Sequence, residues 1–264
     1  KNFREGKSKV LVVEADEWKA SFLHYSPTIS VITGIDKEHL DFYKNVSNVK
    51  KAFLKFVGRT NLGGTLVLNR DDKNVISLRS PIVRIAKRKS LSVLWYSRHS
   101  RACVDLRSVL KVPGEHNVSN ATAAFTAAVA VFKVKKSVAL GALKSFRGAW
   151  RRMEYRGVLK AKSLKLKAVV YDDYAHHPTE IKATLKAFRE KHPRSKLMCV
   201  YQPHQAKRLQ ALYEEFQSAF TDADALILLP VYEVAGRDTV TSKFTSERLA
   251  RAIKKKFSAK EVIY

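Results

Sequence analysis

Short apolar runs alternate with amphipathic segments along the whole chain. The apolar runs predict buried strands over residues 9–14, 29–35, 65–68, 82–85, 92–96, 154–159, 168–171, 196–201 and 225–229. Apolar residues spaced three or four positions apart predict helices over residues 46–57, 118–132, 206–220 and 246–257, and another that begins at Pro178. Strands that alternate with helices in this way predict an α/β fold with parallel strands and right-handed crossovers.

The segment 169–180, with the sequence VVYDDYAHHPTE, places a dense polar group directly after a predicted strand. The polar side chains are Asp172, Asp173, Tyr174, His176 and His177. In doubly wound sheets the carboxyl ends of the strands border the ligand crevice, so this group predicts a functional site. The alternative is a solvated turn. Pro178 suits the first turn of the following helix, and either Thr179 or His177 would cap it.

Two earlier predicted strands also end in acidic segments. The run over 9–14 leads into the sequence EADE, and the run over 29–35 leads into DKEHLD, which contains His39. If the two strands are neighbours, these segments converge, and a carboxylate with an imidazole forms a workable environment for Mg²⁺ or Mn²⁺. The alternative is that the acids begin helices, where the helix dipole favours negative charge.

Asn117 and Asn120 stand at the start of the predicted helix 118–132, after the turn-rich sequence VPGEH. Either asparagine would cap that helix. Two amides in one helical turn could also bind a base edge, because each amide both donates and accepts hydrogen bonds, although capping is the commoner explanation.

The segment 146–153, with the sequence FRGAWRRM, interrupts the periodic pattern. We therefore predict a boundary here between a first domain, residues 1–146, and a second domain, residues 147–264. Arg151 and Arg152 are suited to clamp a phosphate bidentately. The alternative is that they belong to a solvated linker.

Composition indicates a globular chain with a strongly basic surface. Hydrophobic residues make up 45% of its 264 residues, and no apolar run reaches the roughly 20 residues that span a bilayer. The two cysteines lack metal-ligand spacing, which favours reduced core thiols in a cytoplasmic protein. Fifty Lys and Arg against 24 Asp and Glu leave a net charge of +26, which attracts polyanions. The basic residues are scattered without a nucleic-acid-binding motif, so a phosphate-rich substrate is the favoured partner over a specific nucleic acid.

Six segments together resemble the Mur ligases, the ATP-dependent amide-forming enzymes of peptidoglycan precursor synthesis. They read VVEADEWKASFL, ITGIDKEHLDFY, PGEHNVSNATAA, FRGAWRRME, YDDYAHHPTEIKATL and YQPHQAKRL, in an order and spacing that cover nearly the whole chain. The resemblance implies an α/β fold: a truncated central ATPase domain followed by a Rossmann-like C-terminal domain with a mainly parallel sheet. It also implies ATP and Mg²⁺ as cofactors.

The resemblance assigns a first group of residues to metal and nucleotide. Glu14 and His39 match the family's magnesium ligands beside the ATP γ-phosphate. His116, Asn117 and Asn120 match the HNxxN motif, whose asparagines contact adenine.

A second group of residues belongs to the hinge and the second domain. Arg152, or its neighbour Arg151, matches the hinge arginine that reaches the phosphates, and Asp173 matches an aspartate that helps to hold nucleotide. Arg208 matches an arginine that receives the carboxylate of the amino acid. The loop that faces nucleotide and amino acid contains Tyr174, His176 and His177. The catalytic roles implied by the resemblance fall on His39, Asp173, His176 and Arg208.

The reaction implied is acyl transfer through an acyl phosphate. ATP phosphorylates the carboxylate of UDP-N-acetylmuramate, the amine of L-alanine attacks, and phosphate leaves. The family's GxxGKT-type phosphate loop and its UDP-binding domain do not occur in these residues. We therefore expect a fragment of a cytoplasmic, cell-wall-forming ligase that is inactive alone.

Other functions also fit parts of the sequence. A murein-tripeptide recycling ligase shares the acceptor but couples a peptide, and a folylpolyglutamate-type ligase is disfavoured by the DDYAHHPTE match. A basic nucleic-acid-binding module is the alternative from another class. Salt-dependent DNA binding with sequence preference, and without a response to ATP and Mg²⁺, would support that module.

Overall fold

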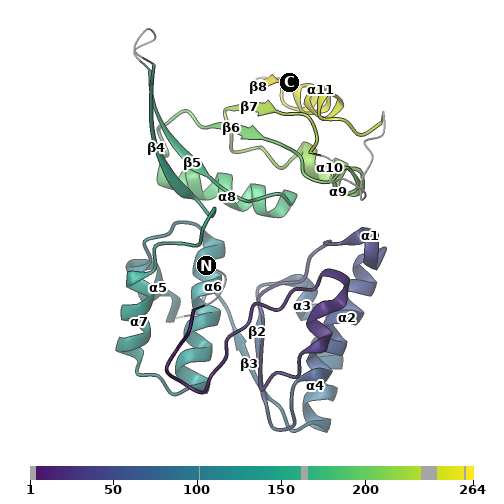
Figure 1. Cartoon of the computed structure of the whole chain (residues 1–264), viewed down its shortest axis with the longest axis vertical. Coiled ribbons are helices and arrows are strands. Elements are labelled where there is room, and N and C mark those ends of the chain that lie inside the picture. Colours follow the sequence, from purple (N-terminus) through teal and green to yellow (C-terminus); the bar gives the residue numbers. More distant parts are fainter. Residues whose placement is uncertain (1–3, 101, 162–165, 233–242, 259) are drawn as a thin grey trace.

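The computed structural model describes residues 4–100, 102–161, 166–232, 243–258 and 260–264. Figure 1 shows the chain in two groups of elements, with the three strands of the first group in one part and the remaining strands in the other. The strands are β1 (Ile29–Ile32), β2 (Thr65–Asn69), β3 (Ser92–Tyr96), β4 (Glu154–Ala161), β5 (Leu166–Asp172), β6 (Met198–Tyr201), β7 (Ala225–Leu228) and β8 (Glu261–Ile263).

Helices connect or cover these strands. In the first half they are η1 (Trp18–His24, a 3₁₀ helix), α1 (Leu40–Tyr43), α2 (Val46–Arg59), α3 (Lys73–Ser77), α4 (Arg79–Arg88), α5 (Ala102–Val109), α6 (Glu115–Thr126), η2 (Ala127–Val131, a π-helix) and α7 (Lys136–Ser145). In the second half they are α8 (Pro178–Lys191), α9 (Ala206–Ala211), α10 (Tyr213–Gln217) and α11 (Ser246–Lys256). Within the described ranges, none combines the length and the apolar character needed to cross a bilayer.

Strands β1, β2 and β3 form a parallel sheet in that order. Helices cover both faces of the central strand, as parallel sheets require, with α6 on one side and α2 to α4 on the other (Figure 1). Leu66 and Leu68 of β2 belong to the core that also contains Phe22 and Ile82. Val67 points to the opposite face and packs with Ala123 of α6. The carboxyl ends of these strands therefore sit at one edge, next to η1 and α1.

The second half contains two sheets. Strands β4 and β5 form an antiparallel ribbon, whereas β6, β7 and β8 form a parallel sheet in that order. The hydrophobic core beside the β6–β8 sheet contains Ile181 from α8, Phe216 from α10 and Leu249 from α11, together with Leu226 of β7. The predicted α/β class with parallel strands is confirmed, while the ribbon adds an antiparallel pair. The predicted boundary between residues 146 and 147 lies in the irregular segment between α7 and β4 and stays a prediction.

Two predicted strands are wrong. Residues 9–14 have no regular secondary structure, and Val12 is 86% exposed. A strand needs a neighbour that accepts and donates backbone hydrogen bonds, and among the described residues this run pairs with none. Residues 82–85 lie inside α4, where Ile82 and Ala86 are buried on one helical face. The apolar residues of that segment are therefore spaced by a helical turn and not by strand alternation.

The predicted start of α8 is confirmed in detail. Pro178 occupies the first turn, and the ring Nδ1 of His177 accepts a hydrogen bond from the amide of Thr179 (3.2 Å). Glu180 closes a capping box by accepting from the amides of His176 (3.0 Å) and His177 (3.3 Å). The histidine, and not Thr179, is therefore the cap, and it holds the polar loop before α8 in one conformation.

Candidate functional site

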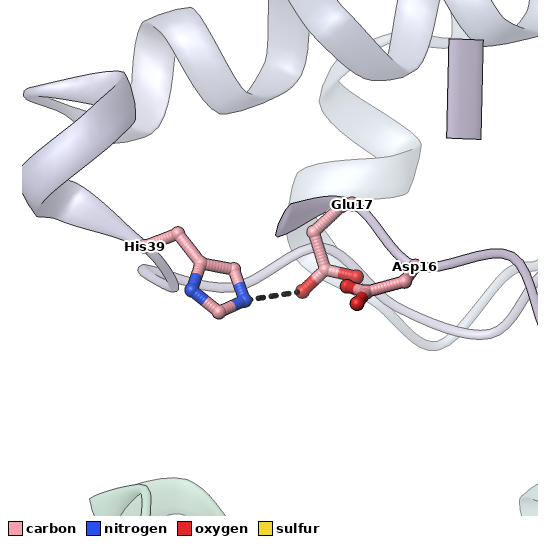
Figure 2. Close-up of side chains that lie close together, drawn as sticks. All are labelled: Asp16, Glu17 and His39. Atoms are coloured by element: carbon pink, nitrogen blue, oxygen red, sulfur yellow. Dashed lines mark ion pairs between the residues drawn. The ribbon is translucent and has the colours of Figure 1, made fainter. Parts of the chain in front are cut away.

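The carboxyl end of β1 and the segment before η1 bring Asp16, Glu17 and His39 together. One ligand atom from each lies within 4.8 Å of the others, and Figure 2 shows the three side chains facing one another. Nε2 of His39 is 3.4 Å from Oε1 of Glu17. The amide of Trp18 donates to Oδ1 of Asp16 (2.8 Å), which turns the chain into η1 and presents the neighbouring Glu17.

The local electrostatics favour charge on both members of the Glu17–His39 pair. The hydrogen bond from His39 lowers the pKa of Glu17 despite its burial. Burial alone would lower the pKa of His39, but the hydrogen bond to Glu17 and the nearby Glu38 carboxylate outweigh it and raise that pKa. Once the cation replaces the proton on His39, the two carboxylates and the imidazole, with ligand atoms within 4.8 Å of one another, are a donor set suited to a divalent cation.

The structure groups Asp16 and Glu17, and not Glu14, with His39. Glu14 is exposed at the end of the irregular segment 9–14. The assignment of Glu14 to the metal stays a prediction that this cluster does not support. The sequence showed the four residues EADE as a candidate, but it did not show which carboxylates face the histidine.

Asp173 connects the segment before β4 to the segment before α8. Its Oδ2 accepts a hydrogen bond from the amide of Met153 (2.7 Å), and its Oδ1 accepts from the amide of Ala175 (2.7 Å) and, at 3.4 Å, from the hydroxyl of Thr184. Both carboxylate oxygens are therefore occupied by protein donors. In this arrangement Asp173 positions the hinge and the polar loop relative to each other.

Both hinge arginines converge on the exposed ring of Tyr174. The guanidinium of Arg151 lies 5.1 Å from the ring centroid and that of Arg152 lies 5.9 Å from it. Arg151 also contacts Asp172 (3.2 Å), and Arg152 contacts Glu180 (3.3 Å). The arginines are therefore organised and not merely solvated, and together with an aromatic face they suit a ligand that carries both a planar ring and phosphates.

His176 belongs to this loop as well. Its Nδ1 lies 2.9 Å from the carbonyl oxygen of Tyr174 and 3.5 Å from Oε2 of Glu180. The adjacent His177 is buried, and its Nε2 has no hydrogen-bond partner within the described residues. His176 is thus the histidine of the pair that is turned toward the loop, whereas His177 supports the helix.

The HNxxN residues begin α6, but neither asparagine caps it. The N-cap position is Gly114, with a φ of +99°, and Asn117 donates its side-chain N–H to the carbonyl oxygen of Pro113 (2.7 Å). Asn120 is exposed one turn later. Burial lowers the pKa of His116, whose Nδ1 is buried without a partner among the described residues. The alternative of capping is therefore wrong, and a role in ligand binding stays a prediction.

Arg208 of α9 lies at a cavity that also contains His39. The cavity has a volume of about 270 Å³, and its lining includes Lys37, Glu38, His39, Lys207 and Arg208. We call it the Arg208 cavity. Only 8% of the Arg208 side chain is exposed, and its guanidinium is 3.4 Å from Oε2 of Glu38. The fold thus brings His39 and Arg208, which are 169 positions apart in the sequence, to the lining of one small polar cavity.

Three consecutive residues supply polar contacts between the two halves of the chain, in addition to the packing of α1 against α9 and of α6 against α8. Asp36 accepts a hydrogen bond from the hydroxyl of Thr179 (2.7 Å), Lys37 pairs with Glu215 (2.8 Å), and Glu38 pairs with Arg208. Sequence reasoning missed all three as interface residues. Their charged pattern, DKE before His39, was visible, but only the fold shows that they face α8, α9 and α10.

Comparison with known proteins gives consistent matches along the chain. The family model described as the Mur ligase middle domain matches residues 1–128, and the one described as the Mur ligase, glutamate ligase domain matches residues 151–264. These two ranges lie on either side of the predicted boundary at residues 146 and 147.

Curated relatives and solved structures agree with the family models. A protein of Clostridium acetobutylicum named UDP-N-acetylmuramate–L-alanine ligase is 39% identical over 271 residues, covering 96% of this chain and 57% of the relative. A protein of Clostridium botulinum with the same name is 36% identical and is covered to 56%. The chain therefore spans about half the length of the curated relatives that it matches. The crystal structure of UDP-N-acetylmuramate-alanine ligase MurC from Thermotoga maritima superposes with a TM-score of 0.63 at 23% identity, covering 94% of this chain and 53% of that chain, which shows a shared fold.

Proposed function

Since the chain belongs to the Mur ligase family, we propose that it is the nucleotide- and amino-acid-handling part of an ATP-dependent ligase. The ligase joins L-alanine to the carboxylate of UDP-N-acetylmuramate, with release of ADP and phosphate. This substrate pair is the one that the names of the curated relatives state. The reaction takes place in the cytoplasm, where ATP and nucleotide-linked sugars are available.

The observation that carries this proposal is the Arg208 cavity. A ligase of this kind must hold an amino acid with its amine close to a phosphorylated carboxylate. Arg208 offers a carboxylate receptor at one side of the cavity, and His39 links its other side to the Asp16–Glu17–His39 cluster. The cavity is smaller than the roughly 300–1,000 Å³ of pockets for drug-sized ligands, so it suits a small amino acid better than a nucleotide.

Roles for the chain's own residues follow from their positions. Asp16, Glu17 and His39 would hold Mg²⁺, which neutralises charge on transferring phosphoryl oxygens when it is bound. Arg151, Arg152 and the ring of Tyr174 form the surface for nucleotide.

Asp173 accepts a hydrogen bond from the amide of Met153 and thereby holds the hinge against the polar loop that precedes α8. His176 lies beside Tyr174, at the edge of the nucleotide surface.

A phosphate-release assay on the complete gene product tests the proposal. We expect release only when ATP, Mg²⁺, UDP-N-acetylmuramate and L-alanine are all present. Release that needs a peptide in place of L-alanine would reveal a recycling ligase instead. Absence of release with every acceptor, together with salt-dependent DNA binding, would overturn the ligase proposal in favour of a nucleic-acid-binding module.

A further inference from the structure

Glu38 occupies the position where a substrate carboxylate would meet Arg208. Its Oε2 lies 3.4 Å from Nη2 of Arg208, and both side chains line the Arg208 cavity. The second contact of the guanidinium is from Nη1 to the carbonyl oxygen of His204 (3.2 Å). The contact between Glu38 and Arg208 is therefore a single-point contact, although the planar guanidinium can bind a carboxylate through two parallel hydrogen bonds.

Burial explains why a carboxylate is needed there when the cavity is empty. With 8% of its side chain exposed, Arg208 is largely removed from water. A buried charge without a counterion is strongly unfavourable, so an internal acid has to stand beside it. Glu38 is 21% exposed and lies on the segment between β1 and α1, which places its carboxylate at the rim of the cavity.

The long distance indicates a weak pair that can be exchanged. Charge-assisted hydrogen bonds between nitrogen and carboxylate oxygen usually measure roughly 2.7–2.9 Å, which is shorter than the 3.4 Å seen here. A free amino acid can offer both oxygens of its carboxylate to Arg208, whereas Glu38 offers one. Two carboxylates on one guanidinium would also repel each other, so the incoming carboxylate displaces Glu38.

We propose that Glu38 is an internal stand-in for the amino-acid carboxylate, which holds Arg208 in the empty cavity and is displaced when the substrate binds. This inference rests on the proposed function for the identity of the amino acid. It assigns to Glu38 a positioning role that opposes substrate affinity. The displaced Glu38 is then free to interact with the cationic Lys37 and Lys207 of the same lining.

The test measures the affinity of the complete protein for L-alanine and for acetate by calorimetry, at constant ionic strength, before and after Glu38→Gln. The substitution keeps the shape of the side chain and removes the competing charge. We expect the dissociation constant of L-alanine to fall about tenfold, which corresponds to about 1.4 kcal/mol. A residue that merely maintained the structure would give weaker binding when replaced, so the direction of the change is the decisive readout.

Glu215→Gln is the matched control. Glu215 pairs with Lys37 across the same interface but does not line the cavity, so its replacement loosens the contact between the halves without freeing Arg208. We expect alanine affinity to stay within about twofold for this variant. Equal tightening in both variants, unchanged affinity in Glu38→Gln, or no binding of either ligand to Glu38→Gln would each overturn the inference.

Acetate separates this inference from the proposed function. It carries the carboxylate but has no amine to be ligated. If acetate binds more tightly to Glu38→Gln while no phosphate is released with any acceptor, Glu38 is a stand-in and the ligase proposal fails. If phosphate release requires L-alanine but Glu38→Gln does not bind it more tightly, the ligase proposal holds and the role of Glu38 is refuted.

Discussion

Replacing Asp173 by alanine tests whether this carboxylate holds the hinge, because it removes the acceptor of two short hydrogen bonds. The amides of Met153 and Ala175 both donate to it at 2.7 Å. Hydrogen bonds to charged groups contribute about 1.5–3 kcal/mol each. Asp173 is only half-buried, and water replaces part of what is lost, so we expect a local cost of about 2–3 kcal/mol.

The assay is residue-resolved hydrogen exchange, because a two-part chain need not unfold in one step. A cost of about 2–3 kcal/mol corresponds to about 30- to 160-fold faster exchange at the amides of Met153 and Ala175. Asp172→Ala, one residue earlier at the end of β5, is the control. Its carboxylate meets Arg151 at 3.2 Å with both side chains more than a third exposed, and such surface pairs contribute about 0–1 kcal/mol.

Two results would refute this reasoning about Asp173. One is unchanged protection of the Met153 and Ala175 amides in Asp173→Ala. The other is an equal loss of protection in the Asp172 control, which would show that any removed charge loosens the hinge. In the complete enzyme we also expect Asp173→Ala to lower the ligation rate strongly, since Asp173 holds the hinge and the polar loop that carries Tyr174 and His176 in place.

Three further predictions concern stability, pH and metal. Gly114→Ala should destabilise the chain by about 2 kcal/mol or more, since its φ is +99° and a Cβ would lie 2.7 Å from the His116 ring. Gly58→Ala, in the last turn of α2 where an added Cβ meets nothing within 4 Å, should instead stabilise the chain by up to about 1 kcal/mol; thermal unfolding of both variants decides. Burial holds the folded-state pKa of His116 below its ordinary value of 6.5, so its contribution to stability is present above that pH and is lost as the pH falls through the lowered value. The free energy of unfolding of His116→Gln should therefore depend less steeply on pH between about pH 5 and 7, and an unchanged slope would contradict this. Glu17→Gln should weaken Mn²⁺ binding, measured by electron paramagnetic resonance, by about tenfold or more, whereas Glu14→Gln should leave it unchanged; the reverse order would restore Glu14 as the ligand.

Helices and strands were predictable from the sequence in segments whose own apolar spacing determines which of the two they form. Helix α2 and strands β2, β3 and β7 lie where their apolar spacing places them, within a residue or two. The strand predicted over 9–14 was wrong because an apolar pattern alone does not make a strand. A strand also needs a neighbouring strand as its hydrogen-bond partner, and the fold offers none beside this run among the described residues. The strand predicted over 82–85 was wrong because three apolar residues among four do not distinguish a strand from a buried turn of helix.

Local chemistry that lies within a few residues was also readable from the chain alone. Pro178 in the first turn of α8 and a cap at His177 or Thr179 were predicted from adjacent residues, and the structure selects His177 and adds the capping box with Glu180. The polar loop before α8 and the two hinge arginines were visible as candidate site residues for the same reason, and their role in ligand binding stays a prediction. Their convergence on the ring of Tyr174 was not, because it depends on how the hinge folds back on that loop.

The amino-acid sequence alone thus established the α/β class, the family and the segments that contain the candidate site residues. Which carboxylates face His39, and which acid neutralises Arg208, was decided by the packing of η1, α1 and α9. The physical reason is one of range. Backbone periodicity and capping act over a few residues, whereas a cation site or a buried ion pair requires side chains from distant positions to meet within about 4 Å, and only the folded core brings them there.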